Sequence, residues 1–250
     1  MDLHINTEGK PEGPVLVFSN SLGANLQMWD EVVSSLLPHF KVLRYDTRGL
    51  GKSTVSPGPY SIPQLGEDVI AMLDERGYDK VHFCGLSMGG QIGQWLGIHH
   101  PERIDKLILS NTAAKIGREN RWNARIRLIN QKGLGVIWEG TQKVWFRDEF
   151  IQQEQEKMLS IKEMFLSHEV EGYIACCAAI RDADFREDIS RIQLPTLIIA
   201  GEKDTSTTVA EAEFMAERIS GSQLSVLPAR HISCIEQPEM FASNLINFLT

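Results

Sequence analysis

A serine held between two glycines, directly behind an apolar run, constrains this chain more than any other feature. The apolar residues 81–84 are typical of a buried strand, and Gly85, Ser87 and Gly89 follow them in a Gly-x-Ser-x-Gly pattern. A serine on a sharp turn from strand to helix has a strained backbone, and the positions two before and two after it must lack side chains. Such a pattern can also be an ordinary glycine-lined turn, but residues 88–99 have the apolar spacing of a buried helix. The context therefore predicts a nucleophile elbow and acyl-transfer chemistry.

A serine nucleophile of this kind needs an acid and a histidine further along the chain, each on a loop behind a later strand. Residues 197–200 are typical of a buried parallel strand, and Asp204 follows them on a loop of small polar residues. Residues 223–227 alternate in polarity like another strand, and His231 follows them. We therefore predict that Ser87, Asp204 and His231 form a catalytic triad.

Other acids and histidines compete for these two roles. Glu202 is the nearest alternative acid, and three aspartates that precede the strand have the wrong order along the chain: Asp182, Asp184 and Asp188. His82 lies inside the strand before the elbow, where an interior histidine is expected. The remaining histidines lie at strand starts, at helix ends or in a polar helix, and we expect them to be solvated or to cap helices: His4, His39, His99, His100 and His168.

The order of these motifs resembles the α/β-hydrolase superfamily over nearly the whole chain. Residues 19–23 (Ser-Asn-Ser-Leu-Gly) follow an early apolar strand, and residues 46–53 (Asp-Thr-Arg-Gly-Leu-Gly-Lys-Ser) follow the next one. The resemblance implies an α/β-hydrolase fold, a mostly parallel, doubly wound α/β sheet with an inserted helical cap. It also implies that Asp46, Arg48 and Gly51 belong to a structural loop that braces the floor near the site.

Three stretches resemble a narrower group, the 3-oxoadipate enol-lactonases of bacterial aromatic catabolism. These stretches are residues 85–90, 110–117 and 176–184, and the last two discriminate because many esterases share the elbow. The resemblance implies a serine hydrolase that opens the lactone ring of 3-oxoadipate enol-lactone to 3-oxoadipate in the β-ketoadipate pathway. The amino end is short for this group, which leaves open whether residues 3–5 form the usual first strand.

Two other functions are compatible with the same triad. A carboxylesterase or a cofactor-free haloperoxidase (perhydrolase) would prefer neutral esters or turn over peracetic acid. A small-ligand receptor would keep the triad and use the capped pocket for sensing. Dehalogenases and epoxide hydrolases are disfavoured, because they place an aspartate where Ser87 stands.

Two backbone amides are predicted to stabilise the oxyanion that forms when Ser87 attacks an acyl carbon. One belongs to Met88, the residue after the nucleophile, and the other to the loop at residues 21–23, where Leu22 is favoured. His231 would accept the serine proton, and Asp204 would hold the imidazole in the required tautomer.

Strand and helix patterns alternate at both ends of the chain but not in its middle. Between Thr112 and Ile189 the sequence has helical periodicity and no convincing strand. We therefore predict a hydrolase core at residues 1–111 and 190–250 and a helical cap at residues 112–189. The expected strands are residues 3–5, 15–18, 41–45, 81–84, 106–109, 197–200 and 223–227.

The substrate that the resemblance implies carries a free carboxylate, so the cap should supply a cation and an apolar wall. Three arginines share one face of a predicted helix: Arg118, Arg121 and Arg125. Arg181 lies in one of the stretches that resemble the lactonases. As substrate-binding candidates we name Trp122, Trp138 and Arg181. The alternative for the arginines is a solvated helix face, and for the tryptophans, including Trp145, it is the core of the cap.

Composition limits the partners of this 250-residue chain. A net charge of −8 without a basic run argues against nucleic acid and anionic membranes. No apolar stretch approaches the ~20 residues of a spanning helix, and the amino terminus lacks the pattern of a secretory signal. The four cysteines lack metal-ligand spacing, so we expect no metal and no cofactor. We expect a cytoplasmic enzyme that acts on a small anionic lactone or ester.

Overall fold

A mostly parallel sheet runs through the centre of the molecule. The computed structural model describes residues 2–250, and within them seven strands pair in the order β1-β3-β2-β4-β5-β6-β7. Only β1 is antiparallel to its neighbour, β3. The strands are β1 (Ile5–Gly9), β2 (Val15–Ser19), β3 (Lys41–Tyr45), β4 (Val81–Leu86), β5 (Ile104–Ser110), β6 (Thr196–Gly201) and β7 (Gln223–Leu227). The expected doubly wound α/β sheet is therefore confirmed.

The first strand differs from the expectation. β1 occupies Ile5–Gly9 and not residues 3–5, because its pairing with β3 runs from Ile5 opposite Tyr45 to Gly9 opposite Lys41. This edge strand is mostly polar and largely exposed, so it lacks the apolar run that marks the central strands.

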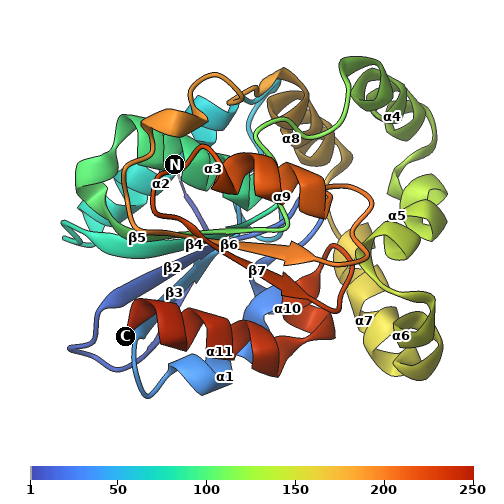
Figure 1. Ribbon diagram of the computed structural model, residues 1–250. Coiled ribbons are helices and arrows are strands. Elements are labelled where there is room, and N and C mark those ends of the chain that lie inside the picture. Colours follow the sequence, from blue (N-terminus) through green and yellow to red (C-terminus); the bar gives the residue numbers. More distant parts are fainter. Residues whose placement is uncertain (1) are drawn as a thin grey trace.

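Helices cover both faces of the sheet (Figure 1). α2 (Ile62–Glu75), α3 (Met88–His99) and α9 (Val209–Ala216) lie on one face, and α1 (Asp30–Leu36) and α11 (Pro238–Leu249) lie on the other. β4 and β6 are consequently buried along their whole length, as parallel strands between two helical layers usually are.

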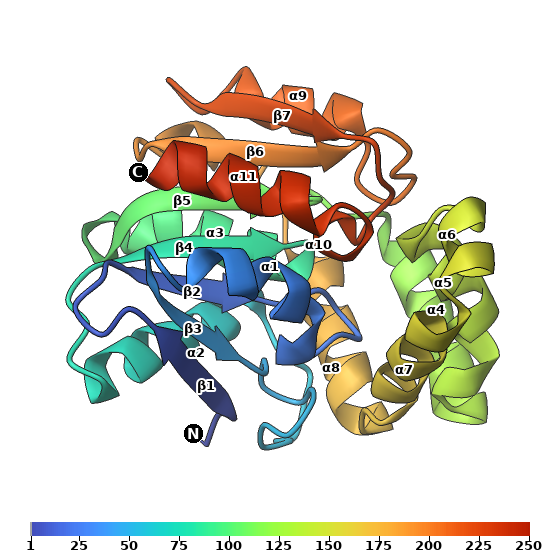
Figure 2. The same ribbon diagram turned by 90° about the horizontal axis from the view of Figure 1, so that it is seen from below.

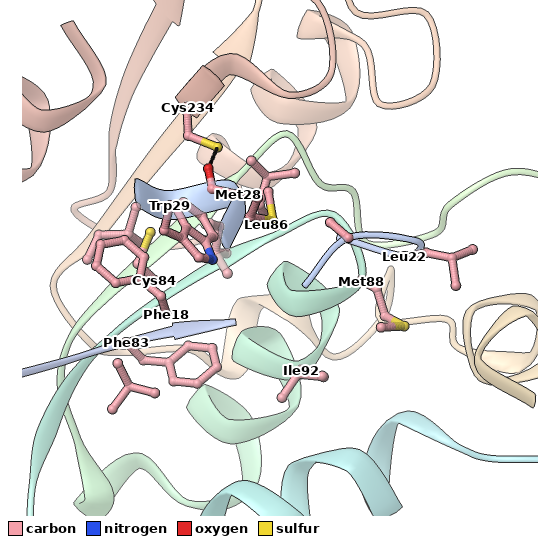
Figure 3. Close-up of a cluster of buried hydrophobic side chains, with 14 of the residues drawn as sticks. Phe18, Leu22, Met28, Trp29, Phe83, Cys84, Leu86, Met88, Ile92 and Cys234 are labelled. Atoms are coloured by element: carbon pink, nitrogen blue, oxygen red, sulfur yellow. Dashed lines mark hydrogen bonds between the residues drawn. The ribbon is translucent and has the colours of Figure 1, made fainter. Parts of the chain in front are cut away.

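Aromatic side chains pack between the sheet and the helical layer of α1 and α11 (Figure 3). The fully buried Trp29 ring lies 4.5 Å from the ring centroid of Phe18. It also lies 5.9 Å from the ring centroid of Phe241. In the short helix α10 (Ser233–Glu236), the thiol of Cys234 donates a hydrogen bond of 3.6 Å to the carbonyl of Met28. The core therefore fixes α10, which begins directly behind the loop of the predicted base.

Between β5 and β6 the chain leaves the sheet and forms a group of helices beyond the carboxyl ends of the strands (Figures 1 and 2). These helices are α4 (Glu119–Lys132), α5 (Trp138–Trp145), α6 (Asp148–Gln153), α7 (Gln155–Leu166) and α8 (Val170–Asp182). β5 and β6 are neighbours in the sheet, so the excursion begins and ends at adjacent strands. The inserted helices therefore lie over the edge of the sheet that carries the predicted triad residues.

Candidate active site

Ser87 lies on the sharp turn that joins β4 to α3. Its backbone has φ 58° and ψ −110°, a left-handed conformation that is rare for residues other than glycine. A Cβ atom on Gly89 would lie 2.2 Å from the carbonyl oxygen of Ser19, and one on Gly85 would lie 2.0 Å from that of Gly89. Both glycines are thus required by close backbone approach, and the strain at Ser87 marks a functional position.

His231 and Asp204 meet across the carboxyl ends of β7 and β6. The Nδ1 atom of His231 lies 2.8 Å from Oδ2 of Asp204, and the two residues are 3 % and 5 % exposed. Asp204 also accepts hydrogen bonds from the backbone amides of Ser206 and Thr207 and from the Thr207 hydroxyl. Burial by itself raises the pKa of Asp204, but the charge and hydrogen bond of His231 and the two amides together lower it below its ordinary value. Asp204 is therefore held as a carboxylate that orients the imidazole.

Asn111 belongs to this site and was not identified from the sequence. It directly follows β5 with φ 40°, and its Nδ2 donates to Oδ2 of Asp204 at 3.2 Å and to the carbonyl of Arg230 at 3.1 Å. Its Oδ1 accepts hydrogen bonds from the hydroxyls of Ser110 and Ser233. An asparagine just beyond a central strand, a residue type that tolerates left-handed backbone, was the available signal.

One cavity of about 370 Å³ brings Ser87, His231 and Leu22 together with the inserted helices. The lining from the insertion is apolar and aromatic with two arginines and, among the residues that the structure describes, no acid: Ile116, Gly117, Arg121, Trp122, Arg125, Val136, Ile137, Gly140, Thr141, Val144, Trp145, Tyr173 and Ile180. Ser21 and Ser206 complete the lining. A serine and an imidazole that share one cavity with two arginines suit a small anionic acyl substrate.

The two predicted oxyanion donors lie on adjoining backbone segments. The amide of Gly89 donates to the carbonyl of Asn20 at 3.1 Å, which joins the start of α3 to the loop that contains Leu22. Within residues 2–250, neither the Leu22 nor the Met88 amide donates a hydrogen bond to another protein group. Figure 3 shows the Leu22 and Met88 side chains on these two segments. An oxyanion hole requires two amides that no other protein group occupies, and these two amides meet that requirement.

Of the three substrate-binding candidates, the structure brings only Trp122 to the cavity. Its indole Nε1 donates to the carbonyl of Ile116 at 2.8 Å, and the ring forms part of the lining. Trp138 is not in the lining, because its buried ring packs in the core of the cap against Trp145 and Phe165. Trp138 therefore belongs to the core of the cap, which is the alternative that the sequence left open.

Arg181 also lies outside the cavity lining. Its guanidinium donates two bonds of 2.7 Å to the carboxylate of Asp182 and one of 2.9 Å to Oδ1 of Asn123. The neighbouring acid therefore occupies the donors that a substrate carboxylate would need. Sequence position alone does not reveal this pairing.

Arg125 and Arg121 lie where Arg181 was expected. Nη2 of Arg125 donates to the Tyr173 hydroxyl at 2.6 Å and to Oγ1 of Thr141 at 3.2 Å, and Nε is buried without a partner within residues 2–250. In that part of the chain neither arginine has a carboxylate within 4.0 Å. Arg118, the third arginine of the predicted face, lies just before the first turn of α4 and is not in the cavity lining. The cavity thus holds a partly desolvated positive charge that lacks an acidic partner.

His168 contradicts the expectation of a solvated or capping histidine. It is 4 % exposed, and its Nδ1 accepts a hydrogen bond of 2.9 Å from the amide of Gly51. Burial lowers the pKa of this imidazole, with partial opposition from the Gly23 carbonyl and the Asp46 carboxylate. His168 joins the cap to the loop of Asp46, which accepts from the backbone amides of Leu26 and Lys52.

The described part of the chain contains no cluster of three or more His, Cys, Asp or Glu side chains suited to a metal ion. In residues 2–250, no helix is both long and apolar enough to cross a bilayer.

The fold, the elbow and the charged pair behind it are those of an α/β hydrolase. Residues 14–238 match the α/β hydrolase fold family, and the chain belongs to this family. It is 45 % identical over 239 residues to 3-oxoadipate enol-lactonase 2 of Acinetobacter baylyi, covering 96 % of this chain and 90 % of that protein. It is 39 % identical over 247 residues to 3-oxoadipate enol-lactonase 1 of the same organism, covering 99 % and 92 %.

A solved structure gives the same relationship. The enol-lactonase from Burkholderia xenovorans superposes with a TM-score of 0.97 at 38 % identity, covering 99 % of this chain and 96 % of that chain. The family resemblance seen in the sequence is therefore confirmed.

Proposed function

We propose that this protein is a serine hydrolase that opens 3-oxoadipate enol-lactone to 3-oxoadipate. One observation carries the proposal: the strained Ser87 and the Asp204-bound His231 line the same cavity. The names of the similar Acinetobacter and Burkholderia proteins support the lactone as substrate. The pocket chemistry supports it independently, because its cations suit an acidic ligand.

The proposed reaction has two stages. His231 Nε2 accepts the proton of the Ser87 hydroxyl as the serine oxygen attacks the lactone carbonyl, and the amides of Leu22 and Met88 stabilise the oxyanion. Ring opening breaks the acyl–oxygen bond and releases an enolate oxygen that remains tethered to the acyl group. His231 returns its proton to this enolate oxygen, and the resulting enol converts to a ketone, which disfavours reclosure and leaves His231 neutral. A water activated by His231 then hydrolyses the acyl enzyme and releases the dicarboxylate.

We propose that the free carboxylate of the substrate binds between Arg125 and Arg121. Nη2 of Arg125 is fixed by Tyr173 and Thr141, and the charge lacks an acidic partner in the described residues. Arginine binds carboxylates through paired N–H donors, and a partly desolvated pair is stronger than one in water. A neutral ester would leave this charge uncompensated, which disfavours the carboxylesterase and perhydrolase alternatives.

Residues 112–189 are proposed as the cap of this enzyme, over a core of residues 1–111 and 190–250. This inserted segment as a whole supplies most of the residues that line the cavity, which supports a role in selecting the substrate. Four buried free cysteines, Cys84, Cys176, Cys177 and Cys234, support the proposal of a reducing, cytoplasmic location.

Loss of the ultraviolet absorbance of the enol-lactone tests the proposed function. Wild type should turn over the lactone much faster than neutral nitrophenyl esters, and Ser87→Ala should lose at least about a thousandfold of kcat. Rapid ester turnover without lactone turnover would instead identify a carboxylesterase. Binding of the lactone without turnover by folded wild type would favour the receptor.

A further inference from the structure

A buried carboxylate outside the triad links the cap to the loop of the base. The side chain of Glu236, in α10, is 0 % exposed. Its Oε1 accepts from the backbone N–H of Arg147 at 2.9 Å and from Nε of the same residue at 3.1 Å. Its Oε2 accepts from the backbone N–H of Arg230. A fully buried charge is costly unless it is saturated in this way, so the arrangement calls for an explanation.

The partners of Glu236 lie on two different parts of the molecule. Arg147 precedes the first turn of α6 in the cap, and Arg230 immediately precedes His231. A single carboxylate therefore bonds the cap with one oxygen and the histidine loop with the other.

Further bonds fasten the same two segments. The amide of Ile232 donates to the carbonyl of Trp145 at 3.1 Å, and Nη1 of Arg230 donates to the carbonyls of Phe146 and Lys143. The residues on both sides of His231 are thus held, the preceding one by Glu236 and the following one by the cap itself. Trp145 lines the cavity, so one wall of the substrate pocket and the base form a single bonded unit.

We propose that Glu236 is a positioning residue that couples the docked cap to the alignment of His231 with Ser87. This inference rests on the proposed function, since it concerns the base of that reaction. When the bonds of Glu236 are lost, the histidine loop gains freedom, and a displacement of about 1 Å at a reacting group can cost about a hundredfold in rate.

The carboxylate is specifically suited to this position. It presents two acceptor oxygens to three N–H groups, whereas a glutamine has one acceptor oxygen and would direct its NH₂ at an N–H group. Glu236→Gln therefore breaks either the cap side or the histidine side of the link while it conserves side-chain volume. Arg147→Ala removes only the Nε contact and leaves the backbone N–H bond in place.

The experiment compares these two variants with wild type in steady-state lactone hydrolysis and in the rate of Ser87 labelling by a fluorophosphonate. Glu236→Gln should lower kcat about tenfold or more with KM within about twofold, and Arg147→Ala should show a smaller loss of the same kind. Labelling should slow in parallel, because it also requires His231 to accept the serine proton. Glu217→Gln, at an exposed glutamate directly after α9, is the matched control and should behave like wild type.

Three results would overturn the inference: folded variants that keep kcat, losses confined to KM, and a lower kcat without slower labelling. If Glu236→Gln does not fold, as judged by circular dichroism, Arg147→Ala decides the question by the same criteria. Labelling does not depend on the identity of the substrate. Wild type that reacts with the phosphonate but not with the lactone would therefore refute the proposed substrate and leave this test intact.

Discussion

Replacing Arg125 with methionine isolates the charge that we assign to substrate recognition. Methionine keeps the unbranched stem and the helix propensity of the side chain and removes the guanidinium. Hydrogen bonds to a charged group contribute about 1.5–3 kcal/mol, and at about 1.4 kcal/mol per factor of ten this corresponds to roughly 10- to 150-fold. The Thr141 hydroxyl keeps its bond to the Ile137 carbonyl, so Tyr173 is the main protein group that loses a partner. The variant should fold.

The assay measures kcat/KM for the lactone acid and for a neutral nitrophenyl ester, with Arg127→Met as control on the exposed side of α4. We expect Arg125→Met to lose roughly 10- to 150-fold for the lactone, mainly through KM, and to stay within about threefold for the ester. Arg127→Met should match wild type on both substrates. Equal losses on the two substrates would refute the assignment, because they would mean that Arg125 acts only by supporting the cap.

Three further perturbations test other parts of the site. Gly89→Ala places a Cβ against the Ser19 carbonyl, so phosphonate labelling should disappear and the melting temperature should fall; near-normal labelling would contradict the close approach. Asn111→Gly tolerates the left-handed backbone but loses the bond to Asp204, so kcat should fall about tenfold at constant KM, and an unchanged kcat would count against this bond. Burial lowers the pKa of His168, so as the pH falls the unfolded chain binds the proton before the folded chain does. The free energy of unfolding, measured in urea, should therefore decrease below pH ~6.5. His168→Asn should make this decrease shallower, and an equally steep decrease would disprove the effect.

The elbow could be predicted from sequence because its determinants are local. Gly85 and Gly89 bracket Ser87 within five residues, and the bounds of α3, Met88–His99, coincide with those predicted. The pairing of Asp204 with His231 could be predicted because each residue follows a strand whose sequence pattern is distinct. The edge strand β1 lacks such a pattern, and its bounds were therefore misplaced.

The cap could not be predicted at the same level, because its helices orient by packing against each other. The sequence favoured Arg181 over Arg125, because Arg181 lies in a stretch that resembles the lactonases. Only the three-dimensional structure shows that Asp182 pairs with Arg181. Glu236 gave no signal at all, since its function depends on two residues, Arg147 and Arg230, of which one lies 89 positions away.

The insertion between adjacent strands has a consequence for how new specificities arise on this scaffold. A segment that departs from β5 and returns to β6 can be exchanged between related enzymes without altering the connections of the sheet. The bonds from Glu236 and Arg230 restrict such exchange, because a grafted cap without a matching segment at residues 143–147 would leave a buried anion unpaired. Evolution of the pocket wall at α5 is thus tied to inheritance of the loop that carries Arg230.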